Sequence, residues 1–261
     1  MIQTIGDITG YIDVAQLVLY AFWLFFFGLI HYLRQEDKRE GYPLEMDPSE
    51  ARLRGTRQGF PSLPKPKVFR LPHGGTVLAP GPRRESREIR AEPIAPWPGA
   101  PLEPTGDPMR DGVGPAAWAE REDEPDLTLE GDLKIVPIRV ATDFFVASED
   151  PDPRGMPVVA VDGVSPGKVV DIWIDRAEYV IRYLEVQLEG GGRTVLLPMN
   201  YAKVMPAQGE IRVVSVLAQH FAHVPAIAEP NRITFLEEDK IVAYFAGGYL
   251  YATAERLGPL L

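Results

Sequence analysis

Cysteine is absent from this chain of 261 residues. Its absence excludes a disulfide scaffold, cysteine-ligated zinc, iron–sulfur clusters and a thiol nucleophile. Basic residues are in the minority, with 27 Lys and Arg against 37 Asp and Glu, so the formal net charge is −10. Proteins that bind nucleic-acid phosphates usually have the opposite balance, and we therefore expect no nucleic-acid partner. The hydrophobic fraction of 45% still suffices for one or two packed domains.

The common motifs of catalysis are also missing from the sequence. It contains no Walker loop, no dinucleotide-binding fingerprint and no nucleophile elbow. His220 and His223 could share one face of a helix, but no carboxylate partner completes a metal site, so a structural role is favoured. His31 could ligate a pigment or a haem, although a position among lipid headgroups is the simpler interpretation. The residues themselves therefore indicate no catalytic group and no metal site.

Residues 1–33 contain no lysine or arginine, and an apolar run occupies most of them. The run is unbroken from Leu17 to Ile30, and its flanks extend it to residues 12–33. As a helix this segment would be about 33 Å long, enough to cross the hydrocarbon core of a bilayer. A signal peptide is the alternative, but it needs a basic start, and Asp7 and Asp13 stand there instead. We therefore predict a transmembrane helix at residues 12–33.

The basic residues around this segment predict its orientation. Arg34, Lys38 and Arg39 follow the predicted span, and no basic residue precedes it. The positive-inside rule then places everything after the span in the cytoplasm and residues 1–11 on the opposite side.

Residues 34–125 have the composition of an extended strap. More than half of the 26 prolines fall in this stretch, and proline interrupts helices and inner strands. The stretch therefore cannot be a regular domain, and its composition alone would indicate a linker. Apolar side chains nevertheless recur along it, namely Phe60, Leu63, Val68, Phe69, Leu71, Val77, Leu78, Trp97 and Trp118. Spaced apolar side chains suit a strap that lies over another surface.

A mainly-β domain is predicted for residues 126–261 from alternating polar and apolar side chains. The predicted strands are Lys168–Asp175, Tyr179–Glu189, Arg193–Leu197 and Ile211–Val216. In the first strand, Val170, Ile172 and Ile174 would share one face, and in the second Glu185 would lie on the face opposite Leu184 and Val186. Short strands at this spacing indicate a small barrel or a curled sheet.

Two helical segments are expected after the strands. Leu217–Ala222 has the length of a single short helix. Glu237–Phe245 is helical by pattern, and we expect Gly247 and Gly248 to end that helix.

Three carboxylates lie at or beside the turn between the first two predicted strands, namely Asp171, Asp175 and Glu178. Carboxylates held together at reduced solvation share protons and titrate as a coupled set. Such a cluster can take up protons near neutral pH. The alternative is a solvated turn, which the residues alone favour.

Several longer segments resemble the H subunits of purple-bacterial photosynthetic reaction centres. The similar segments are YAFWLFFFGLIHYL at 20–33, REGYPLE at 39–45, LPKPKVFRLPHGG at 63–75, TGDPMRDGVGPAAW at 105–118, GKVVDIWID at 167–175, RYLEVQLE at 182–189, LLPM at 196–199 and EEDKIVAYFAGGYLYA at 237–252. No single segment is catalytic, but their order and spacing over nearly the whole chain carry the resemblance.

The resemblance implies a single N-terminal transmembrane α-helix, an extended Pro-rich strap, a cytoplasmic mainly-β domain of the PRC-barrel type and short C-terminal helices. The chain would cap the L and M subunits at their cytoplasmic face and help conduct protons to the secondary quinone, as an accessory subunit and not an enzyme. It would bind no cofactor alone; bacteriochlorophyll, bacteriopheophytin, quinones and non-haem iron would lie on partner subunits. The implied location is the bacterial inner or chromatophore membrane, with residues 1–11 in the periplasm and with antenna proteins and lipids as further neighbours.

The resemblance also implies a set of proton-transfer residues. Asp175 and Glu178 match an acidic pair of the family, and Arg182 matches an arginine whose charge would tune that pair. Two histidines at the proton-uptake surface of well-known members are replaced here by Glu130 and Asp132, and a nearby aspartate is replaced by Thr128. The implied set is therefore Asp175, Glu178, Arg182, Glu130, Asp132 and Asp171.

Two functions of other classes stay open from the residues. One is a membrane-tethered adaptor whose β domain binds a cytoplasmic protein. The other is a membrane enzyme with a carboxylate-based site in the barrel. Co-extraction with pigment-bearing partners would distinguish both from a reaction-centre subunit.

Overall fold

The computed structural model describes residues 7–9, 12–42, 60–72, 74–81, 87–97 and 100–257. Parts of the predicted N-terminal segment and strap, and residues 258–261, lie outside the described residues. The chain divides into two compact units, the first comprising Met1–Arg84 and Pro96–Ala100 and the second Glu85–Ala95 and Pro101–Leu261.

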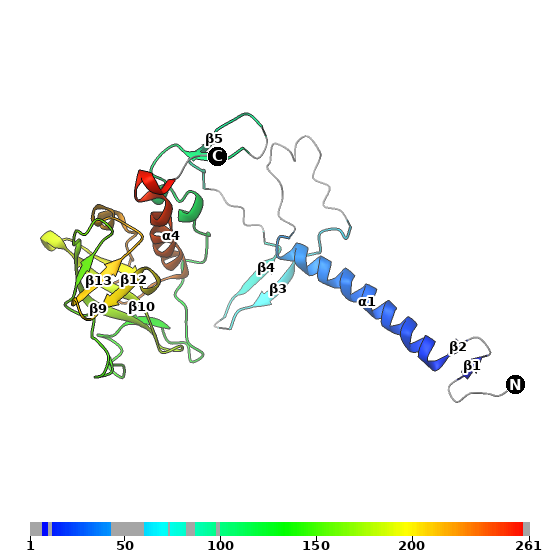
Figure 1. The fold of residues 1–261 in the computed structure, drawn as a ribbon. Helices are drawn as coiled ribbons and strands as arrows, with labels where there is room; N and C mark the ends of the chain where they lie inside the picture. The colour runs from blue at the N-terminus through cyan, green and yellow to red at the C-terminus, as the bar shows by residue number, and fades with distance from the viewer. Residues whose placement is uncertain are drawn as a thin grey trace. The chain divides into compact units, whose positions relative to one another are not determined.

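The first unit is built on one long helix, α1 (Val14–Arg39), after the short paired strands β1 (Asp7–Thr9) and β2 (Ile12–Asp13) (Figure 1). The helix begins at Val14 because the Asp13 carboxylate accepts a hydrogen bond of 2.7 Å from the Gln16 amide and caps the first turn. Its 26 residues span about 39 Å. Among the described residues it is the one helix long and apolar enough to cross a membrane, with a mean hydropathy of 1.9.

The helix continues beyond the predicted end at Leu33, and its last turn holds the following segment. The Arg39 guanidinium donates to the carbonyl oxygens of Lys65 at 2.6 Å and Ala79 at 3.0 Å. These contacts fasten the hairpin of β3 (Lys67–Arg70) and β4 (Thr76–Ala79) to the helix end. The predicted strap therefore contains short regular elements where its prolines leave room for them.

The second unit begins with further short elements of the strap. They are β5 (Ala91–Pro93), β6 (Leu102–Pro104), α3 (Pro108–Asp111) and the 3₁₀ turn η1 (Gly114–Ala116). β5 and β6 pair as an antiparallel hairpin. The later 3₁₀ turns are η2 (Glu189–Gly191), η3 (Met199–Tyr201), η4 (Ala218–His223) and η5 (Ala254–Leu257).

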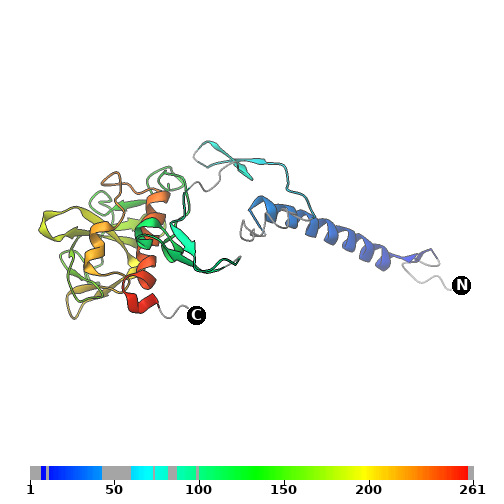
Figure 2. The same ribbon diagram turned by 90° about the horizontal axis from the view of Figure 1, so that it is seen from above.

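The second unit contains a seven-stranded sheet that curls around the core (Figure 1, Figure 2). Its strands are β7 (Ile135–Pro137), β8 (Pro157–Val159), β9 (Gly167–Asp175), β10 (Val180–Leu188), β11 (Thr194–Pro198), β12 (Ala202–Met205) and β13 (Glu210–Val213). The order is β11-β10-β9-β8-β13-β12, and β7 pairs with β9. The core contains Trp173, Leu184, Leu197, Ile211 and Phe245.

A bulge in β9 changes which side chains face the core. Glu185 pairs with Asp171 and Val186 pairs with Val169, so Val170 is an extra residue between them. Val170 is 39% exposed whereas Val169 is 1% exposed. The prediction that Val170 shares one face with Ile172 and Ile174 was therefore wrong. Glu185, on the polar face of the predicted strand, is buried.

The last helix, α4 (Phe235–Tyr251), runs through Gly247 and Gly248 instead of ending before them. A Cβ at Gly247 would lie 2.6 Å from the Ala116 Cβ, and one at Gly248 would lie 2.6 Å from the Ser215 carbonyl oxygen. The two glycines therefore allow α4 to approach η1 and the segment after β13 closely, and the predicted helix break was wrong.

Candidate functional site

The turn between β9 and β10 holds the predicted acidic pair. The Asp175 Oδ1 atom accepts hydrogen bonds from the backbone amides of Ala177 at 3.0 Å and Glu178 at 2.9 Å. Asp175 is 1% exposed, whereas 57% of the Glu178 side chain is exposed. The turn thus carries one buried carboxylate, Asp175, and one that reaches the surface of this unit, Glu178.

Lys134 connects the two carboxylates. Its Nζ atom lies 3.5 Å from Asp175 Oδ2, 3.4 Å from Glu178 Oε1 and 3.3 Å from Asp126 Oδ2. We call these four residues the Lys134 cluster. Burial acts to lower the pKa of the ammonium, but the hydrogen bond to Asp126 and the charge of Asp175 outweigh it, so the pKa of Lys134 is raised. Three carboxylates therefore share one firmly protonated cation.

Sequence reasoning missed Lys134 and Asp126. Lys134 directly precedes β7. It lies at the site because β7 pairs with β9, where Ile135 is opposite Asp175. The Arg176 amide also donates to the Lys134 carbonyl oxygen at 2.9 Å. Long-range pairing of this kind leaves no local pattern in the sequence.

Asp171 lies in the middle of β9 and belongs to a different ion cluster. The Arg139 Nη1 atom is 2.7 Å from Asp171 Oδ2 and 2.6 Å from Glu185 Oε2. The Trp173 indole N–H also donates to Glu185 Oε2 at 3.0 Å. The expectation that Asp171 lies at or beside the strand end was wrong, because three residues of extended strand separate it from Asp175. Its role in proton transfer stays a prediction.

Arg182 is the extra residue of a second bulge, in β10. Its Nη2 atom lies 3.8 Å from Glu238 Oε2, and the Tyr183 hydroxyl donates to the same oxygen at 2.7 Å. Burial raises the pKa of Glu238, against the hydrogen bond from Tyr183 and the charge of Arg182. The ion pair formed by Arg182 is thus with Glu238 on α4, and its tuning of Asp175 and Glu178 stays a prediction.

Glu130 and Asp132 are exposed on a tight turn that leads to Lys134. The Thr128 amide donates to the Asp132 carbonyl oxygen at 2.8 Å, and the Asp132 amide donates to the Thr128 hydroxyl at 3.3 Å. The turn therefore presents both carboxylates to solvent, two and four residues before the lysine of the cluster. Proton uptake at these positions stays a prediction.

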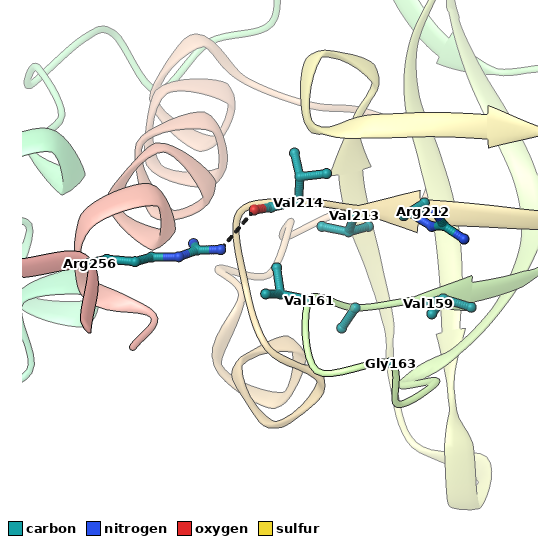
Figure 3. A pocket seen from close by; sticks show the side chains of 8 residues that line it. Val159, Val161, Gly163, Arg212, Val213, Val214 and Arg256 are labelled. Atoms are coloured by element: carbon teal, nitrogen blue, oxygen red, sulfur yellow. Dashed lines mark hydrogen bonds between the residues drawn. The ribbon is translucent and has the colours of Figure 1, made fainter. Parts of the chain in front are cut away.

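A pocket of about 490 Å³ lies elsewhere in the unit, between β8, β13 and η5 (Figure 3). Its lining includes Val159, Val161, Val213 and Val214 with two arginines. The Arg256 guanidinium donates to three carbonyl oxygens, and Arg212 pairs with Glu210 at 2.7 Å. Both arginines are thus engaged by the protein, and the lining contains no carboxylate and no histidine.

His220, one of the two histidines of η4, takes part in the local fold. The Leu217 amide donates to His220 Nδ1 at 3.2 Å, and burial lowers the pKa of His220. Among the described residues, no group of three or more potential metal ligands is found.

Two family models match the chain. The model described as photosynthetic reaction centre, H-chain N-terminal region matches residues 6–140, which is more than half of the chain and includes α1 and Lys134. The PRC-barrel domain model matches residues 146–218, which include β8 to β13 and therefore Asp175 and Glu178.

Proposed function

The chain belongs to the photosynthetic reaction centre H-chain family, and from this we propose that it supports the quinone side of that complex and conducts protons through the Lys134 cluster. The chain is a subunit of a photosynthetic reaction centre with a β domain of the PRC-barrel type, and its described residues include one helix long and apolar enough to cross the membrane.

The observation that carries the proton-conducting role is the pairing of a buried with an exposed carboxylate. A proton crossing from water to a screened site needs one group that meets water and another that does not. Glu178 provides the first, and Asp175 provides the second. Asp175 Oδ1 is held by two amides, whereas Oδ2 has no hydrogen-bond partner among the described residues and lies 3.5 Å from Lys134. Asp175 Oδ2 is therefore the atom on which a passing proton would reside.

Lys134 would keep this pair ready to release protons. Its positive charge stabilises the ionised carboxylates and offsets their mutual repulsion. Asp126 lies beside the same ammonium, so the positive charge of Lys134 would keep an ionised partner when Asp175 or Glu178 binds a proton.

The proposed surroundings of the chain follow from its family and from α1. We place the chain over the cytoplasmic face of the L and M subunits, with antenna proteins and lipids as neighbours. Bacteriochlorophyll, bacteriopheophytin, quinones and iron would be carried by those partners, and this chain would be an accessory subunit without catalysis of its own.

The side chains of α1 are exposed along most of its length, and a Cβ at Gly28 would meet nothing within 4 Å, which leaves room for a partner helix. The basic residues at the C-terminal end of α1 support a cytoplasmic β domain in the bacterial photosynthetic membrane.

Flash spectroscopy of the assembled complex tests the proposal. The Glu178→Gln variant keeps the size of the side chain and removes its titration. We expect it to slow the second, proton-coupled electron transfer to the secondary quinone, more strongly as pH rises, while the first electron transfer is unchanged. Glu229→Gln is the matched control, because the Glu229 side chain is similarly exposed, at 55%, and lies outside the cluster. Wild-type rates for Glu178→Gln at every pH would remove the pair from the proton route.

A further inference from the structure

The turn that carries the acidic pair has an unusual backbone at Tyr179. With a φ of 57°, Tyr179 is the one non-glycine residue of the described part of the chain with a positive φ. Its amide closes the turn by donating to the Asp175 carbonyl oxygen at 2.9 Å. A left-handed residue at the end of a hairpin turn is usually glycine or asparagine, because a larger side chain crowds the backbone. Tyrosine at this position therefore costs stability.

Packing of the tyrosine ring inside this unit offsets little of that loss of stability. Tyr179 is 79% exposed, and its ring meets Phe144 at 5.4 Å between centroids. The next residue, Val180, is also 44% exposed. A strained backbone that displays an aromatic side chain to solvent is typical of a binding surface, where the strain is offset only in the complex.

We propose that Tyr179, with Phe144 beneath it, is the anchor by which this turn docks on the quinone-bearing partner subunits. The partner surface that fits is an apolar slot bordered by cationic groups. The proposal rests on the proposed function and extends it by assigning the contact that holds the proton-conducting turn in place.

The charges around the anchor favour this partner over other occupants. The turn carries Asp175 and Glu178 of the Lys134 cluster, in which three carboxylates face one ammonium. Arg176 in the same turn adds a second positive charge, so the cluster and Arg176 together have a net charge of −1. A cationic protein surface complements this excess of negative charge. An anionic lipid surface would be repelled, and so would a second copy of the chain, because it presents the same acidic turn.

Docking at Tyr179 would also complete the proton site. Glu178 precedes Tyr179, so a partner seated on the ring would lie beside the carboxylate that meets water. The proton-conducting pair would then communicate with the partner's interior and not with solvent alone.

Release of the full chain from the detergent-solubilised complex tests the anchor. We compare Tyr179→Ala, which removes the ring and keeps a Cβ, with Tyr179→Gly, which also removes the strain, and with Tyr179→Phe, which keeps the ring. Val164→Ala is the control, since Val164 is 54% exposed and lies beyond the opposite end of β9. Each chain is stripped from the complex by a chaotrope, and its rate of release is measured together with the urea midpoint of the separated chain.

We expect release to accelerate about tenfold or more for Tyr179→Ala and Tyr179→Gly, because most loss at an interface hot spot appears in the dissociation rate. Tyr179→Phe and Val164→Ala should release at the wild-type rate. Only Tyr179→Gly should raise the urea midpoint of the separated chain, so this variant would be more stable alone and less tightly held in the complex.

The possible failures are distinguishable. A wild-type rate for Tyr179→Ala, in a preparation where the wild-type chain is extracted with pigment-bearing partners, would overturn the anchor and leave the proposed function standing. A Tyr179→Phe variant that releases as fast as Tyr179→Ala would also overturn it. A wild-type chain extracted without pigment would overturn the proposed function and the anchor with it.

Discussion

Replacing Lys134 with methionine tests the central contact of the site. The change keeps the length and the apolar stem of the side chain and removes the charge that Asp126, Asp175 and Glu178 share. Asp175 would then be a buried carboxylate held only by two backbone amides. We expect the second unit to lose stability at neutral pH and to recover it in acid.

The magnitude follows from the distances. A carboxylate 3.5 Å from an ammonium interacts with it by about 5 kcal/mol at an effective dielectric constant of about 20. The Lys134 side chain is still 21% exposed, and in the wild type it has lost part of its own hydration, so the net loss should be about 2–3 kcal/mol. Because the pKa of Lys134 is raised from 10.5, its contribution to stability is complete below that value and is lost as pH rises through the raised pKa.

Urea unfolding of the full chain in detergent, followed by near-ultraviolet circular dichroism, measures the effect. The difference between wild type and Lys134→Met should be largest near pH 7 and should shrink as pH falls through about 4, where carboxylates become protonated. Lys203→Met, at an exposed lysine of β12, is the control and should change little. A loss below about 0.5 kcal/mol at pH 7, within the range of ordinary surface substitutions, would refute the reasoning. A loss that is the same at pH 4 and pH 7 would do so as well.

Two further predictions concern α4. Gly247→Ala should destabilise the second unit by about 1–2 kcal/mol in thermal unfolding, because its Cβ would lie 2.6 Å from that of Ala116 and the gain in helix propensity offsets only part of the overlap; an unchanged or higher melting temperature would show that η1 can move away. Burial raises the pKa of Glu238, so the free energy of unfolding should fall as pH rises from 4.5 towards the raised value, and Glu238→Gln should remove that slope. Parallel pH profiles for the variant and the wild type would contradict the raised pKa.

Most of the fold could be predicted because its signals are local. The apolar run predicts α1, and alternation predicts β9, β10 and β11 to within one or two residues. The errors arise where a second part of the chain intervenes. Val170 does not share the face of Ile172 because β9 has a bulge where it pairs with β10. Gly247 does not end α4; it lies inside the helix, where the absence of a side chain lets Ala116 approach closely.

The candidate site divides in the same way. Asp175 and Glu178 are three residues apart in one turn, so their proximity could be predicted. Lys134 lies 41 positions before Asp175 and meets it through the pairing of β7 with β9, as the match of Ile135 with Asp175 shows. Glu238 comes from α4 and reaches Tyr183 across 55 positions. A periodic pattern contains no information on such contacts, because it describes one element at a time.

The structure also separates two carboxylates of β9 that the sequence placed together. Asp171 has both oxygens occupied, since Oδ1 accepts from the Ile172 amide at 2.9 Å and Oδ2 accepts from Arg139 at 2.7 Å. A proton binding there would have to displace a charged hydrogen bond, which is among the stronger contacts of a protein. Asp175 Oδ2 accepts no hydrogen bond from the described residues, and the Lys134 ammonium lies 3.5 Å from it, farther than Arg139 lies from Asp171. If protons pass along this strand, we therefore expect Asp175 to carry them and Asp171 to hold β9, β10 and Arg139 in place.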